Sequence, residues 1–158
     1  LGTEVAGLLA ATIAKLCEGQ ILEVQSAFDL DRTEATYLTS IDGKTASLLA
    51  TACRIGGIVS ELPRPQIDAL TTFGRSFGMA FQIVDDLLDV EGDPSLLGKA
   101  TEKDLQAGKV NFVSLLGVDG ARDRVRYLAA QAKQHLASFG SRATSLLHTV
   151  DFVLNRRH

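Results

Sequence analysis

A chain of 158 residues that is 46% hydrophobic and 22% charged has the composition of one globular domain, which excludes a disordered protein. Its net charge of −3 disfavours a nucleic-acid partner, since a phosphate backbone binds a basic surface. There is no uninterrupted apolar run long enough for a membrane span. The two cysteines, Cys17 and Cys53, lie in helical patterns and do not have CxxC spacing. We predict that both are buried, reduced thiols of a cytoplasmic protein.

Helical periodicity extends along the whole chain, and strand signals are nearly absent. We predict helices at 3–28, 33–60, 65–91, 102–117, 119–138 and 142–156. The breaks fall near Asp31, at the ELPRP turn, at Gly92-Asp93-Pro94 and at Gly140. The expected architecture is an all-α bundle of long helices. The first helix begins without an initiator Met or a capping residue, so we expect the chain to be a fragment.

The second predicted helix carries a lysine within an apolar stripe. Lys44 is followed by Thr45, and the stripe consists of Tyr37, Ile41, Lys44, Leu48 and Ile55. A lysine in such a stripe commonly extends its ammonium group to water. The alternative is an ammonium group directed at a bound anion.

The third predicted helix ends in FQIVDDLLDVEGD, where carboxylates accumulate without a basic residue. Gln82, Asp85 and Asp89 share a polar stripe that borders the apolar face, and Asp86 flanks it. Asp85 and Asp89 form a like-charged i, i+4 pair that costs roughly 0.2–0.5 kcal/mol. Carboxylates near a helix C-terminus also oppose the macrodipole, at roughly 0.3–1 kcal/mol each. This cluster is either a solvated acidic face or a Mg²⁺ site, because Mg²⁺ is held by a few carboxylates together with substrate phosphates.

The segment after this helix, LLGKATEKDLQAGKV, contains two Gly-Lys pairs, at Lys99 and Lys109. It is not a Walker A motif, because no Ser or Thr follows Lys99 and no strand precedes it. Lysines beside a Mg²⁺ site are the groups that hold a diphosphate and stabilise its departure.

Taken in order, these motifs resemble the trans-polyprenyl diphosphate synthases, such as farnesyl diphosphate synthase. F-Q-I-V-D-D-L-L-D-V followed by L-G-K-x-x-x-x-D-L-x-x-G-K resembles the second aspartate-rich region, and Y-L-T-S-I-D-G-K-T-A-S-L resembles the Lys-Thr helix. G-Q-I-L-E resembles the Gly-Gln segment, with Glu23 where Asp is common, and N-R-R-H resembles the basic tail. Asn111 and Val113 stand where the family usually has Thr and Pro.

The resemblance implies the isoprenoid synthase fold and a Mg²⁺-dependent prenyltransferase that condenses an allylic diphosphate with isopentenyl diphosphate. It implies that Asp85 ligates Mg²⁺ directly, with support from Asp86 and Asp89. It further implies that Thr45 and Gln82 face the carbocation. Diphosphate binding is implied for the lysines, which are Lys44, Lys99 and Lys109.

The family's first aspartate-rich motif and its upstream Gly-Lys-Arg site do not occur in these residues. We therefore expect residues 1–158 to be the C-terminal half of a short-chain, farnesyl-type synthase and to be inactive alone. We also expect the synthase to be a homodimer, as members of the family usually are. Two alternatives stay open: a non-catalytic helical subunit of a heteromeric synthase, and a longer-chain polyprenyl synthase. A terpene cyclase is disfavoured because no N-D-x-x-S-x-x-x-E pattern is present.

Overall fold

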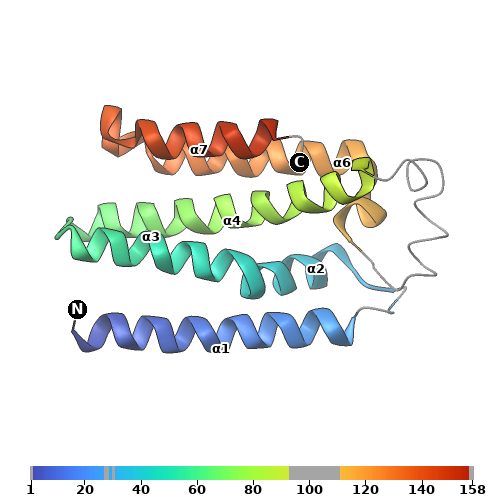
Figure 1. The fold of residues 1–158 in the computed structure, drawn as a ribbon, viewed down its shortest axis with the longest axis horizontal. Helices are drawn as coiled ribbons and strands as arrows, with labels where there is room; N and C mark the ends of the chain where they lie inside the picture. Colours follow the sequence, from blue (N-terminus) through green and yellow to red (C-terminus); the bar gives the residue numbers. More distant parts are fainter. Residues whose placement is uncertain (1, 27–28, 30, 93–110, 157–158) are drawn as a thin grey trace.

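The structure is a computed structural model that describes residues 2–26, 29, 31–92 and 111–156. Every regular element in these ranges is helical, which confirms the all-α prediction (Figure 1). The α-helices are α1 (Thr3–Gln25), α2 (Glu34–Ile41), α3 (Ser47–Val59), α4 (Arg64–Gly92), α6 (Phe112–His135) and α7 (Thr144–Asn155). A π-helical turn, Asp42–Ala46, joins α2 to α3, and a 3₁₀ segment, Ala137–Ala143, joins α6 to α7.

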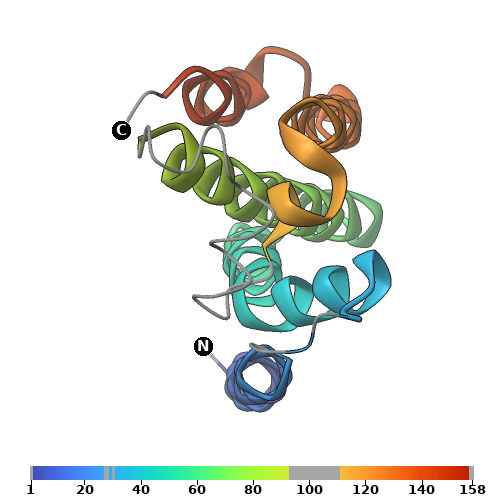
Figure 2. The ribbon, with the colours of Figure 1, turned by 90° about the vertical axis from the view of Figure 1, so that its right-hand side faces the viewer.

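The helices form layers with α4 in the middle. Figures 1 and 2 show α1 on one side, α2 and α3 next to it, and α6 and α7 on the opposite side of α4. As predicted, the apolar stripe of α4 enters the core, where Phe73 and Val84 are buried. One core cluster joins α2, α4 and α6, and a second joins Phe73 to α6 and α7. The acidic end of α4 is therefore packed between α2 and α6.

The predicted helix 33–60 is interrupted by the π-helical turn, which the sequence pattern did not predict. Close approach to α1 accompanies this turn: a Cβ on Gly19 would lie 2.4 Å from the Lys44 backbone nitrogen. A π-helical turn holds more residues per turn than an α-helix, so the residues after it rotate out of the expected register. Leu48 is consequently 50% exposed, although Tyr37 and Ile41 are buried. The predicted common face was wrong at Leu48.

The predicted helices 102–117 and 119–138 correspond to one element, α6, over the described residues. Gly117 breaks its helical geometry with φ 72°, while residues 102–110 lie outside the described ranges. The side chain of Asn111 accepts a hydrogen bond of 2.8 Å from the Ser114 backbone N–H and caps the helix. Asparagine and threonine both serve as N-caps, so a threonine at position 111 would cap α6 in the same way.

The outer face of α1 is apolar and exposed at Leu9, Ile13, Ile21 and Val24. Cys17 is also exposed on α1, so the prediction of a buried thiol was wrong there. Within the described residues, α1 is the one helix long and apolar enough to cross a membrane, and 17% of its apolar window is buried. Core helices of soluble proteins and signal sequences meet the same criterion. The predicted absence of a membrane span therefore stays a prediction.

Candidate active site

The π-helical turn and α4 bring Thr45 and Gln82 into contact. The Thr45 hydroxyl donates a hydrogen bond of 2.9 Å to the Gln82 Oε1. Gly78, one turn earlier on α4, permits this approach, because a Cβ there would lie 2.6 Å from the Ala46 Cα. Two residues 37 apart in sequence, each singled out from its motif, thus share one polar contact. Their role toward a carbocation stays a prediction.

Asp86 is buried, with 8% of its surface exposed, and its carboxylate accepts three hydrogen bonds. The donors are the Tyr37 hydroxyl at 2.5 Å, the Phe112 backbone N–H at 2.9 Å and the Gln82 Nε2 at 3.4 Å. Burial raises the pKa of Asp86, while the Phe112, Tyr37 and Gln82 donors each lower it. Both carboxylate oxygens therefore have protein partners, and the support that Asp86 was expected to lend a metal stays a prediction.

Tyr37 belongs to this site although sequence reasoning placed it only in an apolar stripe. Its ring packs against Phe112 with the ring centroids 5.2 Å apart, and 4% of the residue is exposed. Burial and the nearby Asp86 charge raise the pKa of Tyr37 far above its usual range, so the hydroxyl remains a donor. No local pattern could have revealed this pair, because 49 positions separate Tyr37 from Asp86.

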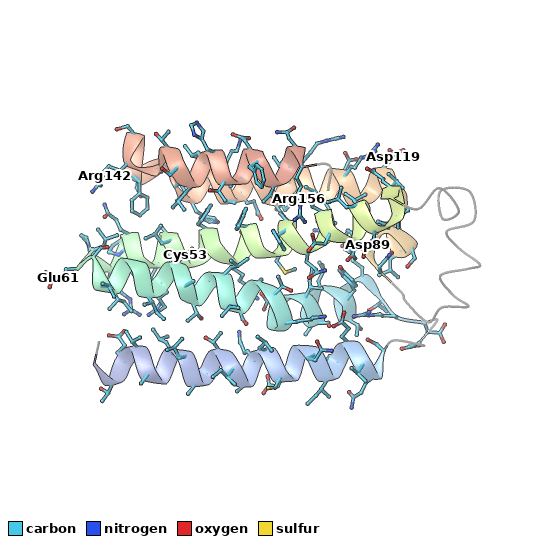
Figure 3. All side chains as sticks on the ribbon, in the orientation of Figure 1. Cys53, Glu61, Asp89, Asp119, Arg142 and Arg156 are labelled. Atoms are coloured by element: carbon cyan, nitrogen blue, oxygen red, sulfur yellow. The ribbon has the colours of Figure 1, made fainter. Side chains whose placement is uncertain are left out.

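Asp85 faces a different partner, Arg156, which follows the end of α7. The Arg156 guanidinium forms an ion pair with Asp85 and lies over the Phe81 ring at 4.5 Å from its centroid. The side chain of Asp85 is 37% exposed, and Asp89 is exposed. Figure 3 shows Asp89 in the last turns of α4 and Arg156 beyond the end of α7. The basic tail identified in the sequence thus contacts the acidic cluster.

The carboxylate donors fit a Mg²⁺ ion only in part. Asp85 and Asp89 are one helical turn apart and lie on the same side of α4. Mg²⁺ is usually held by one or two carboxylates, with waters and phosphates completing its octahedron, so Asp85 and Asp89 would supply that number only when Arg156 leaves Asp85. Over the ranges that the structure describes, no group of three or more His, Cys, Asp or Glu side chains could hold a metal.

Lys44 forms an ion pair with Glu23 of α1, and both side chains are about one-third exposed (35% and 38%). The carboxylate that replaces the family's common aspartate is therefore the present partner of the predicted phosphate-binding lysine. Lys99 and Lys109 lie outside the described residues, so their predicted positions near the acidic cluster stay predictions.

The helical layers are those of an all-α isoprenoid synthase fold. The crystal structure of an FPP/GFPP synthase from Zymomonas mobilis superposes with a TM-score of 0.81 at 30% identity, covering 95% of this chain and 50% of that one. Residues 2–146 match the family model described as polyprenyl synthetase. The chain belongs to this family.

Two curated relatives indicate the range of the family. A prenyl transferase from Synechocystis sp. is 35% identical over 98% of this chain and 59% of its own length. Component 2 of a heptaprenyl diphosphate synthase from Geobacillus stearothermophilus is 32% identical over 90% of this chain and 44% of its own length. The chain thus spans about half the length of the curated relatives it matches.

Proposed function

We propose that this chain is the C-terminal half of a Mg²⁺-dependent prenyltransferase that condenses an allylic diphosphate with isopentenyl diphosphate. The observation that carries the proposal is the contact between the Thr45 hydroxyl and the Gln82 amide oxygen, on the same helix as Asp85. Oxygen atoms without a formal charge can stabilise a carbocation without reacting with it. The proposed product is a short, farnesyl-type chain, with a longer polyprenyl chain as the alternative.

The residues of this chain would divide the work as follows. Asp85 and Asp89 would hold Mg²⁺, which when bound neutralises the charge that develops on the departing diphosphate. Lys44 would exchange Glu23 for a phosphate oxygen, because an ammonium on a flexible stem moves readily between anions. Thr45 and Gln82 would face the carbon that ionises. Lys99 and Lys109 remain sequence-based proposals for phosphate binding.

The test compares Asp85→Asn with Asp119→Asn in the full gene product that contains these residues. Asp119 lies on α6 with its side chain 99% exposed, so it controls for loss of one carboxylate. We expect D85N to lower turnover of isopentenyl and allylic diphosphates by about 10²–10³-fold, since charge-stabilising groups have effects of that size. D119N should match the wild type, and circular dichroism should show both variants folded.

Unchanged turnover in D85N would remove Asp85 from the site and contradict the proposed mechanism. Chromatography of the products would decide between a farnesyl-type and a longer chain. Residues 1–158 expressed alone should give no product, since the first aspartate-rich motif is missing from them. Turnover by this piece would contradict the proposal that it is half of the catalytic unit.

A second proposal concerns assembly, and similarity to a component of a heptaprenyl diphosphate synthase supports it. The chain would then act within a heteromeric synthase rather than the homodimer expected from the family's habit. Size-exclusion chromatography of the full gene product, alone and mixed with other prenyl synthase chains of its source, distinguishes the two. A catalytically active homodimer would exclude the requirement for a second component.

A further inference from the structure

The Gln82 amide lies between two partners of different character. Its Oε1 accepts from the Thr45 hydroxyl at 2.9 Å, and its Nε2 donates to the Asp86 Oδ1 at 3.4 Å. A carboxamide has an acceptor end and a donor end, and a half-turn of the side chain exchanges them. The partner that fixes the amide therefore decides whether the partly negative oxygen or the partly positive NH₂ group lies beside Thr45.

Thr45 cannot fix it, because a hydroxyl both donates and accepts. Asp86 can, because an ionised carboxylate only accepts. A reversed Gln82 amide would place Oε1 against Oδ1 of a residue that is 8% exposed, where two acceptors without a proton between them repel strongly.

Asp86 is itself held in place from two other helices. The Tyr37 hydroxyl of α2 and the Phe112 backbone N–H at the start of α6 both donate to its Oδ2. These two donors occupy one oxygen and leave the other, Oδ1, toward Gln82. The carboxylate thus transmits a fixed orientation from α2 and α6 to the amide on α4.

We propose that Asp86 is a positioning residue that fixes the polarity of the Gln82 amide, so that its oxygen and not its NH₂ group lies beside Thr45. This inference rests on the proposed function, in which Thr45 and Gln82 face a carbocation. An amide oxygen there stabilises positive charge, and an NH₂ group in the same place opposes it. Asp86 acts through Gln82 and needs no contact with metal or substrate.

The variant Asp86→Asn keeps the shape of the side chain but replaces the acceptor that faces Gln82 by a donor. The new side-chain oxygen still accepts from Tyr37 and Phe112, and its NH₂ group then faces Gln82. Gln82 satisfies that donor only by turning its Oε1 toward position 86, and its NH₂ group then donates to the Thr45 hydroxyl. Every buried polar group keeps a partner, so the fold is retained while the amide is reversed.

The experiment uses the full gene product and two probes, a prenyl-chain ammonium and its uncharged carbon isostere, each titrated by calorimetry with Mg²⁺ and inorganic pyrophosphate. The wild type should prefer the ammonium, and D86N should reduce that preference about tenfold, equivalent to about 1.4 kcal/mol. Asp119→Asn is the matched control, because it makes the same change at a side chain of α6 that is 99% exposed. D119N should keep the wild-type preference.

A D86N protein that keeps the wild-type preference overturns the positioning role. A wild type that binds both probes equally overturns the proposed function instead, since Thr45 and Gln82 would then not face positive charge. A third measurement needs no variant: nuclear Overhauser contacts from the Gln82 NH₂ protons to the Thr45 methyl group in the wild type would show the reversed amide and refute the inference. Their appearance only in D86N supports it.

Discussion

Replacing Tyr37 by phenylalanine removes one buried hydroxyl and leaves the ring against Phe112. The lost hydrogen bond, 2.5 Å to the Asp86 Oδ2, ends on a carboxylate that is 8% exposed. Hydrogen bonds to charged groups contribute about 1.5–3 kcal/mol, and water has little access to replace this one. The Phe112 N–H still donates to the same oxygen at 2.9 Å. We therefore expect Y37F to lower the free energy of unfolding by about 2 kcal/mol at neutral pH.

The loss should depend on pH in a defined direction. Burial raises the folded-state pKa of Asp86 above its ordinary value, so the wild type is more stable with Asp86 protonated, and this contribution is lost as pH rises through the folded pKa. The Tyr37 hydroxyl lowers that pKa, so Y37F raises it further. The destabilisation of Y37F relative to wild type should therefore be largest at neutral pH and should shrink as acid protonates Asp86.

Urea unfolding of the full gene product, followed by circular dichroism at about pH 7 and about pH 4, measures both quantities. Tyr127→Phe is the control, because Tyr127 is 56% exposed and its hydroxyl accepts from Gln131 at the surface. Y127F should stay within about 0.5 kcal/mol of the wild type. The same loss in Y37F at both pH values would refute an ionised Asp86 as the hydroxyl's partner.

Three further outcomes are expected. Gly19→Ala should destabilise the protein by about 2–3 kcal/mol in urea unfolding, because its Cβ would lie 2.4 Å from a backbone atom. Gly56→Ala, on a helix with nothing within 4 Å of the new Cβ, should stabilise it by about 0.5–1 kcal/mol, and an equal effect of both changes would contradict the close packing of α1. Asn111→Ala should cost about 1 kcal/mol by loss of the α6 N-cap, and Asn111→Thr should cost little, as thermal unfolding would show. Arg156→Gln should tighten Mg²⁺ binding about two- to fivefold in calorimetry without diphosphate, because it frees Asp85; weaker binding would mean that Arg156 does not compete with the metal.

The sequence was sufficient for those parts of the fold and site that depend on local pattern. Periodicity predicted the helices and the buried stripe of α4. The family resemblance implied that Thr45 and Gln82 face the same carbocation, and the two side chains are in hydrogen-bond contact.

What the sequence could not supply depends on contacts between distant segments. The π-helical turn that exposes Leu48 goes with the close approach of α1 at Gly19, which no local propensity encodes. Tyr37 contacts Asp86 although 49 positions separate them in sequence, and Arg156 contacts Asp85 across a separation of 71 positions. A helical wheel compares residues on one helix only, so it placed Asp86 beside the polar stripe and did not reveal its partners on α2 and α6.

The exposed apolar residues of α1 affect how residues 1–158 behave in solution when they are prepared alone; these residues are Leu9, Ile13, Ile21 and Val24. Apolar area left in water drives association in proportion to its size. Residues 1–158 prepared alone should therefore bind anilinonaphthalene sulfonate strongly and precipitate as ammonium sulfate is raised. A mild detergent that coats α1 should keep the preparation clear, and biochemical work on the isolated piece should begin with that addition.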